Sequence, residues 1–193
     1  SDLNQKNRSQ AMWLRRFLFL GNCLCHPSIL IRKQIYDHIG LYDNRLRQLP
    51  DFEMWIRLVK NYPIHIMDEK LINFRVLPGE NASSATSENV QRIRNELYFI
   101  FQSFFDDVSE SFLKEGFSDI LRNKNFSSKE ELDIEKMLLY FSSGFWDEQI
   151  YKLIGLEKMH QLLVDPKVSA VLWKSYEIDD REFQKISGET NTL

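Results

Sequence analysis

Apolar residues recur at the spacing of an α-helix over most of this chain. Gly21 and Asn22 supply a stop after residues 8–20, of the kind found where a helix ends in a left-handed conformation. Pro50 suits the first turn of a helix that continues to near Asn61. Helices are therefore predicted at about residues 8–20, 33–39, 50–61, 86–105, 108–122, 128–142, 145–154, 156–163 and 166–176.

Short segments between the first helices follow the pattern of β-strands instead. Cys25–Arg32 is rich in apolar and β-branched residues, which predicts a mostly buried strand. Ile64–Met67 and Leu71–Val76 predict further strands, separated by the polar turn Asp68–Lys70. Because helices and strands alternate along this part of the chain, we expect an α/β layer.

The pattern changes after the turn-rich loop 77–84, beyond which helical spacing continues with scarcely a strand signal. We therefore expect an incomplete α/β unit at residues 1–83 and an all-helical extension at 84–193, so that the chain is mostly helical overall. Ser128 opens a capping-box sequence in the extension. The aromatic residues there are expected to pack in the core. Contact with the first unit, a homo-oligomer interface and membrane contact are the alternatives.

The composition is that of a globular protein. The chain has 193 residues, of which 43% are apolar and 27% charged, and this excludes disordered and fibrous classes. A formal net charge of −3 gives no overall attraction to nucleic acid, so no nucleic-acid partner is expected. No apolar run, Phe17–Leu20 among them, approaches the roughly twenty residues that span a bilayer.

The cysteines and the first residues bear on the location of the protein. Cys23 and Cys25 stand one residue apart, a spacing that suits neither a disulfide nor the usual zinc pairs, so reduced thiols are expected. The chain begins at Ser1 without a basic and apolar leader, which fits a cytoplasmic enzyme. Because a starting Met is also lacking, we expect the chain to be a fragment.

An acid stands on the first turn of the helix predicted from Pro50. Asp51 would favour this position for structural reasons alone, because a carboxylate there interacts with the helix dipole and accepts free backbone N–H groups. Trp55 lies four residues further on, on the same helix face. Position alone leaves Asp51 open as either a helix cap or a functional acid.

Blocks of this sequence resemble, in the same order, the second half of family 2 glycosyltransferases of the GT-A fold. The blocks are Gly21–Ser28, Ile39–Asp43, Leu49–Leu58 and Leu71–Arg75. In that family an acid in the third block is the general base, and Asp51 matches it, although Pro50 replaces the more usual glutamate. The resemblance covers about residues 10–83 and implies an incomplete fold of the kind found in nucleotide-diphospho-sugar transferases.

The resemblance implies a reaction in which Asp51 takes the proton of an acceptor hydroxyl as that hydroxyl attacks the donor sugar with inversion. Family members bind Mg²⁺ or Mn²⁺ through an Asp-x-Asp element in the first half of the fold, and this chain has no convincing copy. We expect a divalent cation in the full-length parent and none in this fragment, which we expect to be inactive alone. Asp106–Asp107 and Asp179–Asp180 fit solvated helix faces.

The same resemblance places further residues near the substrates. Trp55 and Arg57 would line the donor and acceptor cleft or steady the diphosphate. Core packing of Trp55 and pairing of Arg57 with a nearby acid are the alternatives. His26 would lie near the cleft beside Asn22, or have a structural role. Arg75 belongs to a segment that often folds over the donor.

As a whole, the resemblance implies a bacterial enzyme that transfers a sugar from a nucleotide-diphospho-sugar to a saccharide or lipid-linked acceptor. Its pathway would be the synthesis of cell-surface polysaccharide or lipopolysaccharide. The expected partners are donor and acceptor, with peripheral association at the inner face of the membrane and homo-oligomerisation through the helical region as further expectations. The rival hypothesis is a non-catalytic helical binding or oligomerisation module, in which Asp51 is only a helix cap.

Overall fold

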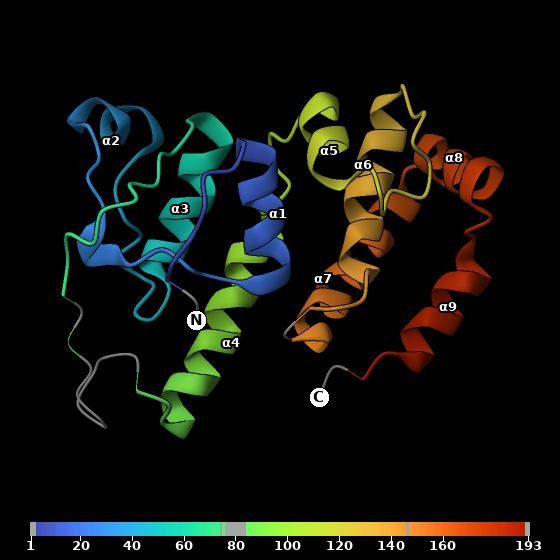
Figure 1. Ribbon diagram of the computed structural model, residues 1–193. Coiled ribbons are helices and arrows are strands. Elements are labelled where there is room, and N and C mark those ends of the chain that lie inside the picture. Colours follow the sequence, from blue (N-terminus) through green and yellow to red (C-terminus); the bar gives the residue numbers. More distant parts are fainter. Residues whose placement is uncertain (1–2, 74, 76–83, 146, 192–193) are drawn as a thin grey trace. The chain divides into compact units, whose positions relative to one another are not determined.

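The computed structural model of this chain describes residues 3–73, 75, 84–145 and 147–191 (Figure 1). Its contacts divide the chain into two compact units, Ser1–Asp107 and Val108–Leu193, which are described separately below. The boundary expected near residue 83 falls outside the described residues. Within the described part, every regular element is a helix.

The first unit consists of helices joined by extended loops. They are α1 (Gln10–Leu20), the short 3-10 turn η1 (His26–Ser28), α2 (Lys33–Ile39), α3 (Pro50–Asn61) and α4 (Ser87–Gln102). The hydroxyl of Ser9 accepts a hydrogen bond from the backbone N–H of Met12 at 3.3 Å and so caps α1. Gly21 ends α1 with a φ of 68°, a conformation that glycine adopts without strain.

The core of the first unit lies around α3. Trp13 and Phe17 of α1 are fully buried, and the ring of Phe17 meets that of Phe52 edge to face at 5.6 Å. On its other side Phe52 contacts Phe101 of α4 at 6.1 Å between ring centroids. Figure 1 shows α1 beside α3. Burial of a side chain such as Phe52 contributes about 1.5–3 kcal/mol, so these contacts hold α3 firmly in the unit.

A buried carboxylate on α4 determines where α3 begins. The side chain of Glu96 is only 4% exposed, yet it meets no cation at its oxygens in the described contacts. Instead it accepts hydrogen bonds from the backbone N–H groups of Arg47 at 2.8 Å, Gln48 at 2.9 Å and Leu49 at 2.8 Å. Since Leu49 is the residue before α3, Glu96 fixes the approach of the chain to that helix.

The prediction of an α/β layer in the first unit is wrong. Cys25–Arg32 contains the turn η1 followed by extended backbone, and neither Ile64–Met67 nor the described part of Leu71–Val76 is a strand. Ile66 shows why. Its backbone N–H and carbonyl pair with the side-chain amide of Asn7 at 2.7 and 3.0 Å, where a strand would need a second backbone. The segment has the alternating apolar pattern of a strand. Among the described residues, however, no second strand lies beside it to form a sheet.

The second unit is a bundle of helices with its own core. Its elements are α5 (Glu110–Phe117), α6 (Lys129–Leu138), the 3-10 turn η2 (Leu139–Phe141), α7 (Glu148–Val164), α8 (Pro166–Tyr176) and α9 (Asp180–Glu189). One apolar cluster joins α6, α7 and α8, and its buried members are Ile134, Met137, Met159, Val168, Leu172, Tyr176 and Ile178. The capping box predicted at Ser128 is confirmed, with Glu131 as its reciprocal partner.

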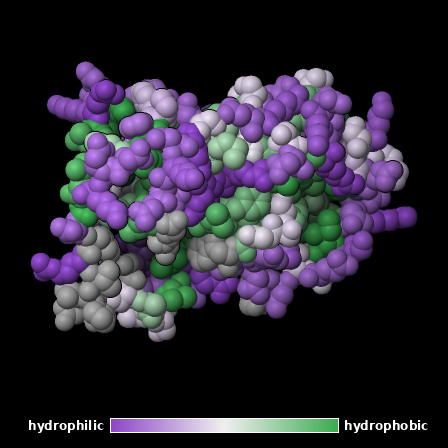
Figure 2. Space-filling model, in the orientation of Figure 1, coloured by the Kyte–Doolittle hydropathy of each residue, from purple (hydrophilic) through white to green (hydrophobic). Residues whose placement is uncertain are grey.

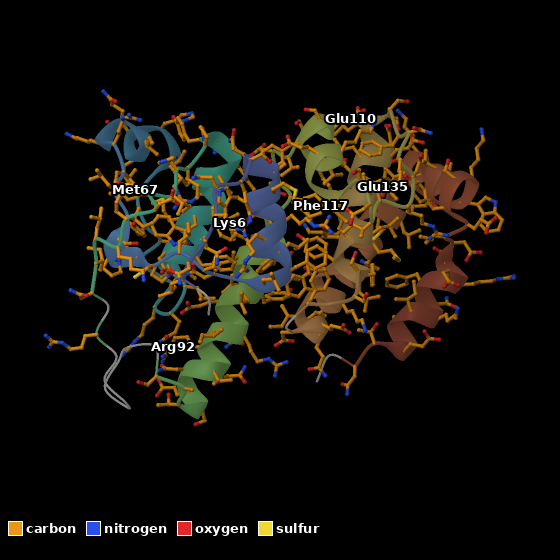
Figure 3. The ribbon with its side chains drawn as sticks, viewed as in Figure 1. Lys6, Met67, Arg92, Glu110, Phe117 and Glu135 are labelled. Atoms are coloured by element: carbon orange, nitrogen blue, oxygen red, sulfur yellow. The ribbon has the colours of Figure 1, made fainter. Side chains whose placement is uncertain are left out.

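A second buried acid repeats the arrangement seen at Glu96. Glu135 on α6, labelled in Figure 3, is 1% exposed and accepts hydrogen bonds from the backbone N–H groups of Arg122 at 3.0 Å and Asn123 at 2.7 Å. Burial raises the pKa of Tyr176, and the nearby acid Glu135 raises it further. Each unit therefore has a loop that is held by a buried carboxylate on a helix.

The helices predicted at 145–154 and 156–163 form one continuous helix, α7. Gly155 lies in its interior, where a Cβ would stand 2.8 Å from the ring of Phe141 and 3.1 Å from the Cβ of Tyr140. The glycine is therefore required by close packing of η2 against α7, and it does not break the helix. Spacing along the sequence cannot distinguish these two roles of an isolated glycine.

The surface is mainly polar, with scattered apolar residues. On the face drawn in Figure 2, hydrophilic residues predominate and hydrophobic ones come to the surface in patches. Large exposed apolar residues include Leu30 at 99%, Leu41 at 74% and Trp173 at 60%. Among the described residues, none of the helices combines the length and the apolar character needed to span a membrane.

Candidate functional site

The candidate site is built around Asp51 in the first turn of α3. One carboxylate oxygen, Oδ1, accepts the backbone N–H of Phe52 at 2.8 Å, so the acid caps its own helix in part. The other oxygen, Oδ2, accepts a hydrogen bond from the side-chain Nδ2 of Asn22 at 3.2 Å. Asn22 is oriented in turn, because its Oδ1 accepts the backbone N–H of Leu24 at 3.1 Å. The structure thus brings two predicted site residues into direct contact.

Four aromatic side chains form a group in the same unit, which we call the aromatic cluster: His26, Tyr36, Tyr42 and Trp55. The ring of His26 lies 5.2 Å from that of Tyr42 and 5.8 Å from that of Trp55. Trp55 is fully buried, Tyr42 is half-buried and His26 is exposed. Trp55 therefore packs in the core, which was one of the alternatives for this residue. The accessible side chains of the cluster are those of His26 and Tyr42.

The environment of Tyr42 shifts the pKa of its phenol. Burial raises the pKa of the Tyr42 phenol above its ordinary value, a hydrogen bond with Tyr36 raises it further, and the negative charge of Asp51 contributes in the same direction. The phenol is therefore neutral at physiological pH. Tyr42 lies within the block Ile39–Asp43 but was not among the predicted site residues. A single tyrosine in a loop has no regular spacing from other residues that would indicate a role.

Arg57 is engaged within the protein. Its guanidinium donates to both carboxylate oxygens of Glu53, through Nε to Oε1 and through Nη2 to Oε2 at 2.7 Å. It also donates to the carbonyl of Leu41 at 2.9 Å and to the carbonyl of Ile39. Of the roles considered for this residue, pairing with a nearby acid is the one present here. These bonds fasten the turn between Ile39 and Leu41 to α3, where Gly40 has a φ of 84°.

Arg75 lies in an exposed part of the chain, and no contact joins it to Asp51 or to the aromatic cluster in the described contacts. Its neighbours Phe74 and Val76 lie outside the described residues. A place for Arg75 over a nucleotide-sugar donor therefore stays a prediction.

The described residues do not suit a metal ion. No three side chains of His, Cys, Asp or Glu come together among them in a way that could hold one. Glu53, the acid nearest to Asp51 in sequence, is committed to Arg57 at 2.7 Å. We therefore derive no chemical step at this site through a metal ion.

The geometry defines a helical unit with an oriented carboxylate beside aromatic side chains. A carboxylate held in this way can accept a proton from a hydroxyl, and aromatic rings suit the apolar faces of sugars.

Comparison with known proteins points to one class of enzyme. A protein of Methanocaldococcus jannaschii that is described as an uncharacterized glycosyltransferase is 28% identical to this chain over 69 residues. The alignment covers 35% of this chain and 23% of that protein, so the chain spans less than a quarter of the relative's length. The chain is thus related to a glycosyltransferase over about a third of its length. No family model and no solved structure matches it.

Proposed function

We propose that this chain is the acceptor-side part of an inverting family 2 glycosyltransferase, with Asp51 as its general base. The observation that carries the proposal is the orientation of the Asp51 carboxylate, whose Oδ2 is held by Asn22 at 3.2 Å at the start of α3. The named relative supports the class of enzyme. The resemblance of the block around Asp51 to the base-containing block of that family supports the role of this residue.

In the proposed reaction an acceptor hydroxyl attacks the anomeric carbon of the donor sugar. A bond forms between the hydroxyl oxygen and that carbon, while the bond from the carbon to the diphosphate oxygen breaks on the opposite face, so the configuration inverts. The hydroxyl proton passes to Asp51, which then releases it to solvent. Asn22 orients Oδ2 by donating one hydrogen bond and leaves that oxygen a second lone pair for the incoming proton.

The remaining parts of the proposal concern the parent protein. We infer that its donor is a nucleotide-diphospho-sugar and its acceptor a saccharide or lipid-linked saccharide, in synthesis of cell-surface polysaccharide or lipopolysaccharide in a bacterium. Donor binding, with Mg²⁺ or Mn²⁺, would belong to the part of the parent outside this chain. We further propose a cytoplasmic location at the inner face of the membrane and homo-oligomerisation through the helices after residue 84.

A non-catalytic helical module is the competing function. It is favoured by the bond from Phe52 N–H to Asp51 Oδ1 at 2.8 Å, because a carboxylate that only caps a helix would make the same bond. The two functions differ in what Asp51 does to a substrate.

The test uses the full-length protein with Mg²⁺ and Mn²⁺, assayed for transfer from a panel of UDP-, GDP- and dTDP-sugars to methyl glycosides. Asp51→Asn keeps an oxygen for the N–H of Phe52 but is a poor base, so transfer should fall by about 10²–10⁴-fold. Asp43→Asn is the matched control, because Asp43 pairs with the largely exposed Arg45 at 2.9 Å. Equal rates for Asp51→Asn and wild type would remove Asp51 from the base role. Absence of transfer from every donor would favour the non-catalytic module.

A further inference from the structure

We propose that His26 and Tyr42 form the surface on which the saccharide acceptor rests, and that Glu53 and Arg57 position Tyr42 by holding the turn from Ile39 to Leu41. The inference rests on the proposed function, because it takes Asp51 as the group that reacts with the acceptor. It assigns a binding role to Tyr42 and a positioning role to Arg57, in place of the diphosphate contact expected from the resemblance.

The rings of His26 and Tyr42 lie against each other. Their planes are inclined by 30° with centroids 5.2 Å apart, and they stand nearly perpendicular to the ring of Trp55, at 82° and 84°. The buried Trp55 therefore contacts both rings. The face of an aromatic ring carries partial negative charge, so it attracts the weakly positive C–H groups on the apolar side of a pyranose ring.

The exposure of these side chains separates a binding surface from ordinary core. Trp55 is fully buried and is therefore inaccessible to a ligand. His26 is exposed and Tyr42 half-buried, so this end of the cluster is open to solvent. Asp51 stands one helical turn before Trp55 on the same face of α3, so the reacting acid lies one turn from the ring that contacts both His26 and Tyr42. A sugar on the rings would bring a hydroxyl toward the carboxylate.

The position of Tyr42 depends on a turn that is unusually well fixed. Gly40 adopts a φ of 84°, and a Cβ there would lie 3.4 Å from Nη1 of Arg57. Arg57 donates to the carbonyls on both sides of this glycine, while Glu53 holds the guanidinium with both oxygens. Only a planar guanidinium can serve two carbonyls and a carboxylate at once; a lysine ammonium offers a single point of charge. Arg57 therefore fixes the turn before Tyr42 against α3, and this fixes the position of Tyr42.

Binding is tested by saturation-transfer NMR on the full-length protein, with methyl β-D-glucopyranoside, methyl β-D-galactopyranoside and methyl N-acetyl-β-D-glucosaminide as probes. Sugar-ring protons should receive magnetisation from wild type and from Asp51→Asn, and lose most of it in Tyr42→Ala. The matched control is Tyr62→Ala, since Tyr62 stacks edge to face on His38 at 5.6 Å, away from the aromatic cluster. Signals that persist in Tyr42→Ala, or that are missing from wild type for all probes, would overturn the inference.

Positioning is tested by kinetics, with acceptor and donor varied separately. Tyr42→Ala should raise the acceptor KM by about tenfold and leave the donor KM unchanged, as expected for loss of one stacked ring. Arg57→Lys should give a similar rise, and the double variant should be no worse than either single one, because both act through Tyr42. Arg45→Lys is the control for the same replacement at an exposed pair.

The outcomes separate the two proposals. Additive effects of Tyr42→Ala and Arg57→Lys, or a rise confined to the donor KM, would refute the positioning role while leaving Asp51 as base. Full activity of Asp51→Asn would refute the proposed function whatever Tyr42 does. Thermal unfolding of each variant shows whether it is folded. If Arg57→Lys does not fold, Tyr42→Ala still tests the binding surface of His26 and Tyr42.

Discussion

Replacement of Glu96 by glutamine should loosen the start of α3 without removing any side-chain volume. The carboxylate accepts three backbone N–H groups, with Oε1 taking Arg47 and Oε2 taking both Gln48 and Leu49. Glutamine has one carbonyl oxygen, which can still accept the N–H groups of Gln48 and Leu49. Its NH₂ group then faces the N–H of Arg47, so a buried donor is left without an acceptor.

The cost follows from these bonds. A buried donor without an acceptor costs about 1–3 kcal/mol, and hydrogen bonds to a neutral oxygen are weaker than those to a charged one by about 0.5–1 kcal/mol each. Glu96→Gln should therefore destabilise the first unit by about 2–5 kcal/mol. Glu88→Gln is the control on the same helix, because Glu88 is 77% exposed and pairs with Arg92. Its cost should stay below about 1 kcal/mol.

Native-state hydrogen exchange at neutral pH measures this effect residue by residue. In the wild type the amides of Arg47, Gln48 and Leu49 should exchange slowly, as donors to a buried oxygen do. In Glu96→Gln the amide of Arg47 should exchange fastest of the three, and urea unfolding followed by fluorescence should report the loss of stability. Unchanged protection at all three amides, with an unfolding midpoint equal to that of wild type, would refute the role given to Glu96.

Two further predictions concern packing and pH. Gly155→Ala should destabilise the second unit by about 1–3 kcal/mol, since its Cβ would stand 2.8 Å from the ring of Phe141. Gly188→Ala on α9 has nothing within 4 Å of its Cβ and should be neutral or slightly stabilising. Equal urea midpoints for the two variants would contradict this. The raised pKa values of Tyr42 and Tyr176 mean that their contribution to stability is fully present below the ordinary tyrosine pKa of about 10. It is lost as the pH rises above that value, because the unfolded chain releases protons that the folded one retains. Urea midpoints measured from about pH 9 to 11 should fall, and fall less steeply in Tyr42→Phe; the same slope in both would show that Tyr42 is not involved.

Helices could be predicted from this sequence because their hydrogen bonds are local. The spacing of apolar residues and the caps at Gly21 and Ser128 act within a few residues, and the structure has helices at those places. Strands depend on a partner elsewhere in the chain. Ile64–Met67 has an alternating pattern, but its described neighbour is the side chain of Asn7, so the pattern alone led to the wrong prediction of a sheet.

The residues of the candidate site were only partly visible in the sequence. Asp51 could be selected because it begins a helix within a block that resembles a known family, and Asn22 and His26 because they stand in another such block. Tyr42 and Glu96 could not, because the importance of each comes from groups distant in sequence: the charge of Asp51 for the former, and the backbone of residues 47–49 for the latter.

The sequence by itself determined most of the helices, the caps at Gly21 and Ser128 and the placement of an acid on the first turn of α3, but it did not predict α9 (Asp180–Glu189). Only the tertiary structure decided what surrounds that acid. It put Asn22 on Oδ2 and turned Arg57 inward to hold a loop. The physical reason is that helix formation depends on neighbours along the chain, whereas the hydrogen bonds and electrostatic environment of a side chain depend on every segment that packs against it.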